Sequence, residues 1–296
     1  MKTVLGIFRA ACYSPGMVER DKAILEAVIA RLQAEGYQVR SLHEEELTPT
    51  TPMPSIAIHM TRSEEALSIL QYWQRSGCTV INAVEGIRSV ERGTLAKSCA
   101  TQGIPTPRTW IASTAGDMPP VAVTTGETAE EIRFPCWIKR TGDCAQQRDD
   151  VCMVSSMEEY AQCLRRFHAR DIPEVVVMEH LEGSCIKFYG VQGTNFFHWL
   201  PAHNLGYDKW ATTTHARASE AVPTATDEAT LHIGDVLRRL TDLDCIRSRQ
   251  LAVYGGDAII GPDGTARLID LNDWPSFSSC RHEAAEAIAQ LVMSMV

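Results

Sequence analysis

The stretch LAVYGGDAIIGPDGTARLIDLNDWPSF, residues 251–277, is the one around which the rest of this chain is organised. Residues 252–260 are apolar and rich in small side chains, and residues 266–271 alternate toward Asp270. The Gly-Pro-Asp-Gly segment between them, residues 261–264, is a turn signal, because proline fixes φ and glycine tolerates a positive φ. The pattern therefore predicts a β-hairpin.

Three oxygen-bearing side chains fall where this hairpin could use them. Asp257 lies on the first strand, and Asp270 and Asn272 lie at the end of the second. Antiparallel pairing brings the strands side by side, and residues two apart in a strand point to the same face. Such hard ligands suit Mg²⁺, which takes its remaining ligands from water and substrate phosphates. On spacing alone, solvated acidic residues at a hairpin end are an equally good interpretation.

The pattern D-x(12)-D-L-N-x-x-P, which begins at Asp257 and includes Asp270 and Asn272, resembles the metal-binding signature of the ATP-grasp superfamily. In that superfamily an Asp, a Glu or Asp, and an Asn two residues later hold the magnesium ions of ATP. The resemblance covers roughly residues 80–280. It implies an α/β protein with α+β subdomains, that is, an ATP-grasp fold with an N-terminal parallel α/β domain. It also implies ATP and Mg²⁺ as cofactors.

Strand and helix signals before this region predict the N-terminal domain. Residues 3–8 indicate a buried strand, residues 17–35 a helix, and residues 56–81 a strand-helix-strand passage, which together predict a parallel sheet. We expect an N-terminal α/β domain at 1–84, a central ATP-grasp subdomain at 85–172, and a C-terminal subdomain with the metal-binding hairpin at 173–296. The loop after the first strand is either an anion site, with Arg9, Ser14 and Arg20, or an ordinary surface turn.

Upstream segments resemble other ATP-grasp parts in the expected order. VINAVEGIRSVERGTLAKSCATQGIPTPRTW, residues 80–110, is similar to the segment that leads into the module, with Arg92 where a lysine is usual. Lys139 ends an apolar strand and matches the lysine that contacts nucleotide phosphates. Residues 179–181 match the hinge whose backbone groups read the adenine edge. The resemblance thus implies these nucleotide-binding residues: Arg92, Lys139, Glu179, His180, Leu181, Glu182 and Lys187.

Catalysis by this fold needs a cation at the developing oxyanion. Lys187 matches a basic residue that contacts the transferred phosphate or developing charge in relatives. D-alanine ligases place an Arg two residues before the first metal Asp, but Gly255 stands there in this chain. Arg281 or Arg217 would then have to serve. Arg217 falls in the polar stretch 205–230, which is either a substrate-reading loop or a surface loop.

Three functions remain open from the sequence. The leading one is an ADP-forming carboxylate-amine ligase that acts through an acylphosphate on an amino acid or small peptide-like substrate. The second is an ATP-grasp inositol phosphate or polyol kinase, because those kinases read D-I-N where this chain reads D-L-N. The third is a nucleotide-binding protein without turnover, which is favoured by departures from the family pattern at Arg92, Cys185, Ser276 and the glycine-poor loop 141–150.

Composition narrows the partners and the location. The 296 residues carry a net charge of −9, which disfavours nucleic acid and anionic membrane surfaces as partners. No apolar run approaches the length of a membrane span. The ten cysteines form no C-x-x-C pair, and the N-terminus lacks a basic region followed by a long apolar core, so we expect a cytoplasmic protein. ATP and a small molecule are the expected partners. A homodimer stays open, although no sequence feature indicates one.

Overall fold

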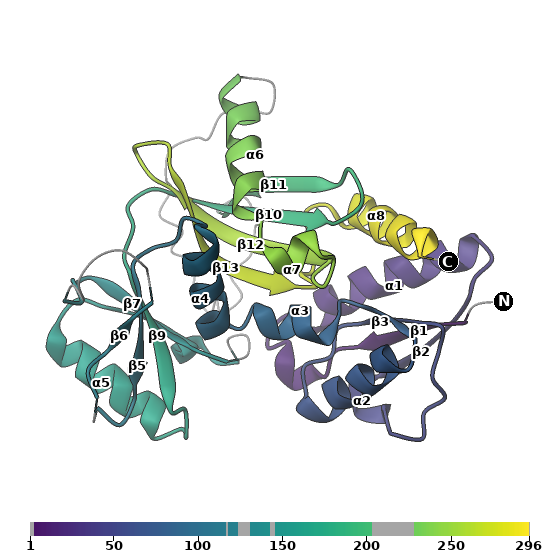
Figure 1. The fold of residues 1–296 in the computed structure, drawn as a ribbon, viewed down its shortest axis with the longest axis horizontal. Coiled ribbons are helices and arrows are strands. Elements are labelled where there is room, and N and C mark those ends of the chain that lie inside the picture. Colours follow the sequence, from purple (N-terminus) through teal and green to yellow (C-terminus); the bar gives the residue numbers. More distant parts are fainter. Residues whose placement is uncertain (1–2, 117, 124–130, 143–145, 203–227, 296) are drawn as a thin grey trace.

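The structure, a computed structural model, describes residues 3–116, 118–123, 131–142, 146–202 and 228–295. These residues form three sheets flanked by helices, with the C-terminal helix lying against the N-terminal part of the chain (Figure 1). The architecture agrees with the predicted α/β class, since one sheet is parallel and the other two are antiparallel. Within the described residues, no helix combines the length and apolar character of a membrane span.

The N-terminal sheet is parallel, as the strand-helix-strand pattern predicted, and its strand order is β2-β1-β3-β4. Its inner strands bury both faces, because side chains alternate between one core under α1 and another under α2. The elements here are β1 (Thr3–Phe8), η1 (Ala11–Tyr13), α1 (Val18–Ala34), β2 (Gln38–His43), η2 (Glu44–Glu46), β3 (Ile56–His59), α2 (Glu64–Arg75) and β4 (Thr79–Ile81).

The middle sheet is antiparallel, in the order β6-β5-β9-β7-β8, and α5 covers one of its faces. The side chain of Ser156 caps α5 by accepting a hydrogen bond from the backbone N–H of Glu159. Its elements are β5 (Thr109–Ser113), β6 (Val121–Ala122), β7 (Cys136–Arg140), η3 (Arg148–Asp150), β8 (Val151–Val154), α5 (Met157–His168) and β9 (Glu174–Glu179). The helices α3 (Val84–Ser89) and α4 (Arg92–Gln102) lead into it.

The predicted domain boundary at residue 173 falls just before strand β9. It assigned the strand at 174–179 to the C-terminal subdomain, but this strand, β9, pairs with β5 and β7 in the middle sheet. The chain changes sheets only after Glu179. The physical reason is that β9 finds its hydrogen-bonding partners between two strands that precede it in the sequence, a pairing that local periodicity does not specify.

The third sheet contains the predicted hairpin and has the order β11-β10-β12-β13. Gly264 at the turn has a φ of 74°, and the N–H of Gly261 donates to the C=O of Thr265 over 3.0 Å, so the turn forms where its sequence indicated. The elements are β10 (Ser184–Val191), β11 (Phe197–Pro201), α6 (Glu228–Leu240), α7 (Asp244–Arg247), β12 (Val253–Ile260), β13 (Ala266–Asp273) and α8 (Arg281–Ser294).

Asn82 joins the N-terminal unit to this hairpin. Its side-chain amide donates to the C=O of Val253 over 2.7 Å, and its side-chain oxygen accepts from the N–H of Val253 over 2.8 Å. The backbone C=O of Asn82 also accepts from His59 Nε2 at 2.8 Å. One buried amide therefore serves as a strand partner for β12 and fixes the hairpin to the parallel sheet.

Candidate active site

The three predicted metal-binding residues lie together on β12 and β13. Asp257 is directly opposite Asp270 in the strand register, and Asn272 is opposite Gly255. Between Asp270 and Asn272, Leu271 is buried in the core, so the two polar side chains share the other face of β13. Within the described residues no group of three or more His, Cys, Asp or Glu side chains is placed to hold a metal ion, and this trio contains only two such residues because its third member is an asparagine.

Cations hold both carboxylates of the trio. Lys187, directly across from Asp257 in the β10–β12 pairing, places Nζ 2.5 Å from Asp257 Oδ1. Arg92 Nη2 lies 3.1 Å from Asp270 Oδ2, and Arg92 Nη1 donates to the C=O of Arg140. Three oxygen donors on paired strands are chemically suited to Mg²⁺, and the charge of Arg92 favours the ionised, metal-binding form of Asp270.

The pKa values at this cluster follow from burial and from neighbouring charge. Burial lowers the pKa of Lys187, but the adjacent Asp257 carboxylate more than reverses this, so the pKa of Lys187 is raised overall. Burial raises the pKa of Asp270, but the positive charges of Arg92 and Lys139 outweigh this effect, so the pKa of Asp270 is lowered overall. Burial dominates at Lys139 and lowers the pKa of its ammonium, against the attraction of Asp270.

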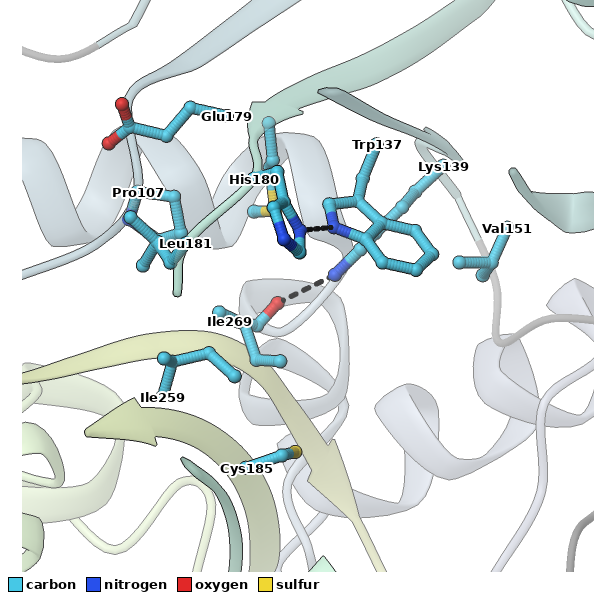
Figure 2. A pocket seen from close by; sticks show the side chains of 11 residues that line it. Pro107, Trp137, Lys139, Val151, Glu179, His180, Leu181, Cys185, Ile259 and Ile269 are labelled. Atoms are coloured by element: carbon cyan, nitrogen blue, oxygen red, sulfur yellow. Dashed lines mark hydrogen bonds between the residues drawn. The ribbon is translucent and has the colours of Figure 1, made fainter. Parts of the chain in front are cut away.

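A cavity of about 300 Å³ opens beside this cluster, between the middle sheet and the hairpin sheet (Figure 2). Lys139 reaches across it and donates from Nζ to the C=O of Ile269 on β13 over 3.0 Å. Its walls are mostly apolar, as in sites for planar organic ligands. Its lining residues are Pro107, Trp137, Lys139, Val151, Met178, Glu179, His180, Leu181, Cys185, Ile259 and Ile269.

Of the predicted hinge residues 179–181, the structure leaves one backbone N–H for a ligand. The N–H of Glu179 donates to the C=O of Arg108 over 3.0 Å, and the N–H of His180 donates to the C=O of Pro135 over 3.3 Å. The carboxylate of Glu179 accepts from the N–H of Arg108. In the part of the chain that the structure describes, no hydrogen bond engages the N–H of Leu181, so this group is the hinge donor that faces no competing partner.

Other predicted site residues lie apart from this cavity. Glu182 is exposed and does not line it. Arg281 is the first residue of α8, its Nε is buried without a hydrogen-bond partner, and it lines none of the cavities described for this region. Arg217 lies outside the described residues. The suggested anion loop is internally satisfied in part, because Arg9 Nη1 and Ser14 Oγ both donate to Asp21 Oδ2, at 3.1 and 2.7 Å.

The departures from the family pattern have structural consequences. Cys185 lines the cavity, and burial raises the pKa of its thiol to about 11, so it is a neutral wall residue. Gly255 cannot carry the arginine of the D-alanine ligases without rearrangement. A Cβ there would lie 2.8 Å from Pro275 Cγ and 2.9 Å from Tyr189 Cδ1.

Arg62 is a site residue that the sequence reasoning missed. It lines a small cavity of about 20 Å³ together with Arg92, Asp270 and Asn272. Its guanidinium forms an ion pair with the buried carboxylate of Asp273, next to Asn272. Its backbone N–H donates to Glu44 Oε1 over 2.8 Å. The position of Arg62 shortly after β3 was the available signal, because ligands of parallel sheets gather at the carboxyl ends of the strands.

Comparison with known proteins identifies the fold of this chain but no family model that matches its sequence. The sequence matches no protein-family model and no curated protein. The structure is similar to that of D-alanine–D-alanine ligase from Bacillus anthracis complexed with ATP (12% identity, TM-score 0.67, 100% of this chain and 98% of that one). It is also similar to a RimK domain ATP-grasp protein from Sphaerobacter thermophilus (14%, 0.64, 98% and 99%) and to D-Ala:D-Ser ligase from Enterococcus faecalis (11%, 0.67, 100% and 99%). The chain therefore has the ATP-grasp fold.

Proposed function

We propose that this ATP-grasp chain is an ADP-forming carboxylate-amine ligase that uses Mg-ATP. The observation that carries the proposal is the convergence of Arg92, Lys139 and Lys187 on the two paired carboxylates at the edge of an apolar cavity. Such a cavity suits a nucleobase, and the cations suit its phosphates. The similarity to ligases in overall fold supports this assignment. The proposal implies ATP and a small carboxylate as partners and a location in the cytoplasm.

The proposed reaction has two steps. A carboxylate oxygen of the first substrate attacks the γ-phosphorus of ATP, the bond to the β-phosphate oxygen breaks, and ADP leaves. The amine of the second substrate then attacks the acyl carbon, and phosphate departs with the bonding electrons while the nitrogen loses a proton. No covalent bond to the protein is needed, so catalysis rests on positioning and electrostatics.

The residues of this chain divide that work. Lys139 and Arg92 offset the negative charge that builds up on the phosphates as they approach the carboxylates. Lys187 stays protonated beside Asp257 and serves as a fixed positive charge. Asp257, Asp270 and Asn272 would hold Mg²⁺, which supplies further charge neutralisation on the phosphate oxygens when bound. Arg62, from the N-terminal unit, adds a positive charge to the small cavity that Asn272 also lines.

Hydroxylamine trapping tests the proposal. With ATP, Mg²⁺, hydroxylamine and a panel of amino acids and small peptides, an acylphosphate is expected to yield an acyl hydroxamate and ADP. The Asp270→Asn variant is the matched control and should give neither product. ADP release with an inositol phosphate and no hydroxamate would favour a kinase, for which the D-L-N segment is the supporting feature. ATP binding without product in either assay would favour a non-catalytic nucleotide-binding protein.

A further inference from the structure

Strand β7 presents an aromatic side chain to the nucleotide cavity where packing does not require one. Cys136 and Ile138 are fully buried in the core beneath α5, so they define the inner face of the strand. Trp137 and Lys139 alternate with them and both line the cavity. The indole of Trp137 is partly exposed and is absent from the α5 core cluster. Because core packing does not account for this large aromatic ring, its role is to be sought in the cavity that it lines.

A hydrogen bond joins Trp137 to the hinge. Trp137 Nε1 lies 3.1 Å from His180 Nδ1, with the two ring centroids 6.1 Å apart and the planes tilted by 43°. The indole nitrogen can only donate, so Nδ1 must accept. A neutral imidazole with an accepting Nδ1 carries its proton on Nε2. Trp137 therefore fixes both the orientation and the tautomer of His180, and leaves Nε2–H as the second donor of the ring.

The rest of the cavity complements a flat aromatic ligand. Figure 2 shows the Trp137 and His180 rings side by side, with Ile259 and Ile269 of the hairpin sheet across the space from them. Lys139 occupies the part of the cavity nearest β13, where its Nζ binds the C=O of Ile269. A nucleotide with its phosphates toward Lys139 and Asp270 would place its base between the indole and the isoleucines. The unengaged N–H of Leu181 follows His180 directly.

We propose that Trp137 and His180 form the base-recognition pair of this nucleotide site. The Trp137 indole stacks on the face of a purine, and the oriented His180 Nε2–H supplements the N–H of Leu181 at the edge of the base. The inference rests on the proposed ATP-dependent function and adds the residues that select the base. Base-aromatic stacking grows with ring overlap, so a purine nucleotide binds more tightly than a pyrimidine nucleotide.

Calorimetric titration with ATP, UTP and inorganic tripolyphosphate tests the pair. Trp137→Leu should weaken ATP binding about 10-fold or more, because a stacking surface is lost, and should leave tripolyphosphate binding unchanged. Trp137→Phe keeps a ring without the N–H and should give an intermediate loss. His180→Ala should weaken ATP binding less in the Trp137→Phe background than in the wild type, because the two residues act together. Trp199→Leu, on β11 away from the cavity, is the matched control and should have no effect.

Fluorescence gives an independent reading. ATP should quench the indole emission of the wild type, and tripolyphosphate should not, with the ATP-dependent change lost in Trp137→Phe and retained in a Trp199→Phe variant. If the wild type binds ATP and Trp137→Leu binds it equally well, the base-recognition pair is wrong while the proposed function stands. An equal loss for ATP and tripolyphosphate would also overturn it, since Trp137 would then only support the phosphate site. If the wild type fails to bind ATP, the proposed function itself fails.

Discussion

Single side chains in this site are held in place by partners within the protein. Asp257 forms an ion pair with Lys187, and Asp270 forms one with Arg92. Lys139 Nζ donates a hydrogen bond to the C=O of Ile269. Because these groups are partly or wholly buried, their mutual attraction is screened less than on an open surface. Such an arrangement suits the proposed ligand, Mg-ATP, which brings both negative charge and a cation.

The carboxylate of Asp270 should be needed for turnover but not for folding. Asp270→Asn keeps the size of the side chain and removes a charged oxygen ligand, so ATP turnover is expected to fall at least about 100-fold. ADP release measures the activity, and thermal unfolding checks the fold. Asp263→Asn at the exposed turn of the same hairpin is the control and should retain activity. Full activity of Asp270→Asn would contradict the metal assignment.

Lys139 should matter more for nucleotide binding than another lysine of the same module. Its side chain is buried at the cavity, whereas Lys97 on α4 is exposed. Lys139→Ala is expected to weaken ATP binding about 10-fold or more, since it removes a charge from a poorly screened site, while Lys97→Ala should leave it unchanged. Calorimetric titration compares the two. Equal losses would show that the nucleotide phosphates lie elsewhere.

Helix α3 shows how whole elements place the site. The backbone C=O of Gln250 accepts a hydrogen bond from the N–H of Ala83 over 2.9 Å. A Cβ on Gly86 would lie 2.2 Å from the same backbone oxygen. Glycine at this position therefore lets α3 dock against the segment before β12. Because α4 follows α3 directly, this docking also sets where Arg92 meets the hairpin.

Replacing Gly86 should separate α3 from the hairpin segment. Gly86→Ala is expected to lower the free energy of unfolding by about 1–3 kcal/mol, because a backbone carbonyl cannot move aside as a flexible side chain can. Urea denaturation measures it. Gly234→Ala on α6 is the matched control, since its Cβ would make only a 3.4 Å contact with Trp199, and the added helix propensity should leave stability equal or higher. A neutral Gly86→Ala would rule out tight docking of α3.

On the scale of the whole molecule, the N-terminal unit and the hairpin sheet share one core. Val28 and Leu32 of α1 belong to the same buried cluster as Ile288 of α8 and Val253 of β12. Arg31 Nε on α1 also lies 2.5 Å from Glu286 Oε2 on α8. Figure 1 shows the two helices side by side, although they stand near opposite ends of the chain. The predicted N-terminal domain, 1–84, is thus covered on this side by the C-terminal helix.

His59 makes this junction sensitive to pH. Burial lowers its pKa from the ordinary value of about 6.5 to about 4, because the enclosed ring loses the solvation of its charged form, and this outweighs the hydrogen bond to the C=O of Asn82, which raises the pKa. Below pH 6.5 the unfolded chain binds a proton that the folded chain does not. Stability is therefore fully present above pH 6.5 and is lost as the pH falls toward 4, by on the order of 3 kcal/mol.

Urea denaturation across this range checks the effect. A His59→Gln variant should be less stable at pH 7.5 but should lose less further stability between pH 6.5 and 4 than the wild type. His232→Gln on the exposed side of α6 serves as the control and should keep the wild-type profile. A His59→Gln profile with the wild-type slope would assign the acid sensitivity to other groups.

Local chemistry was sufficient to predict several parts of this molecule. The hairpin followed from its turn residues and the alternation toward Asp270, and the parallel N-terminal sheet followed from strand and helix periods. These features depend on residues a few positions apart, where φ preferences and side-chain directions decide the outcome. The strand position of Lys139 was predictable for the same reason.

Contacts between distant segments decided the rest. The N–H groups of Glu179 and His180 are occupied by carbonyls of Arg108 and Pro135, so only Leu181 keeps a hinge donor open. Arg62 joins Asp270 and Asn272 only because the parallel sheet packs against the hairpin through Asn82. The periodicity of the sequence does not specify such long-range contacts, because they form only when separate helices and strands pack around a common core. The local sequence thus determined the hairpin and the positions of its acidic residues, whereas tertiary packing determined which other side chains surround them.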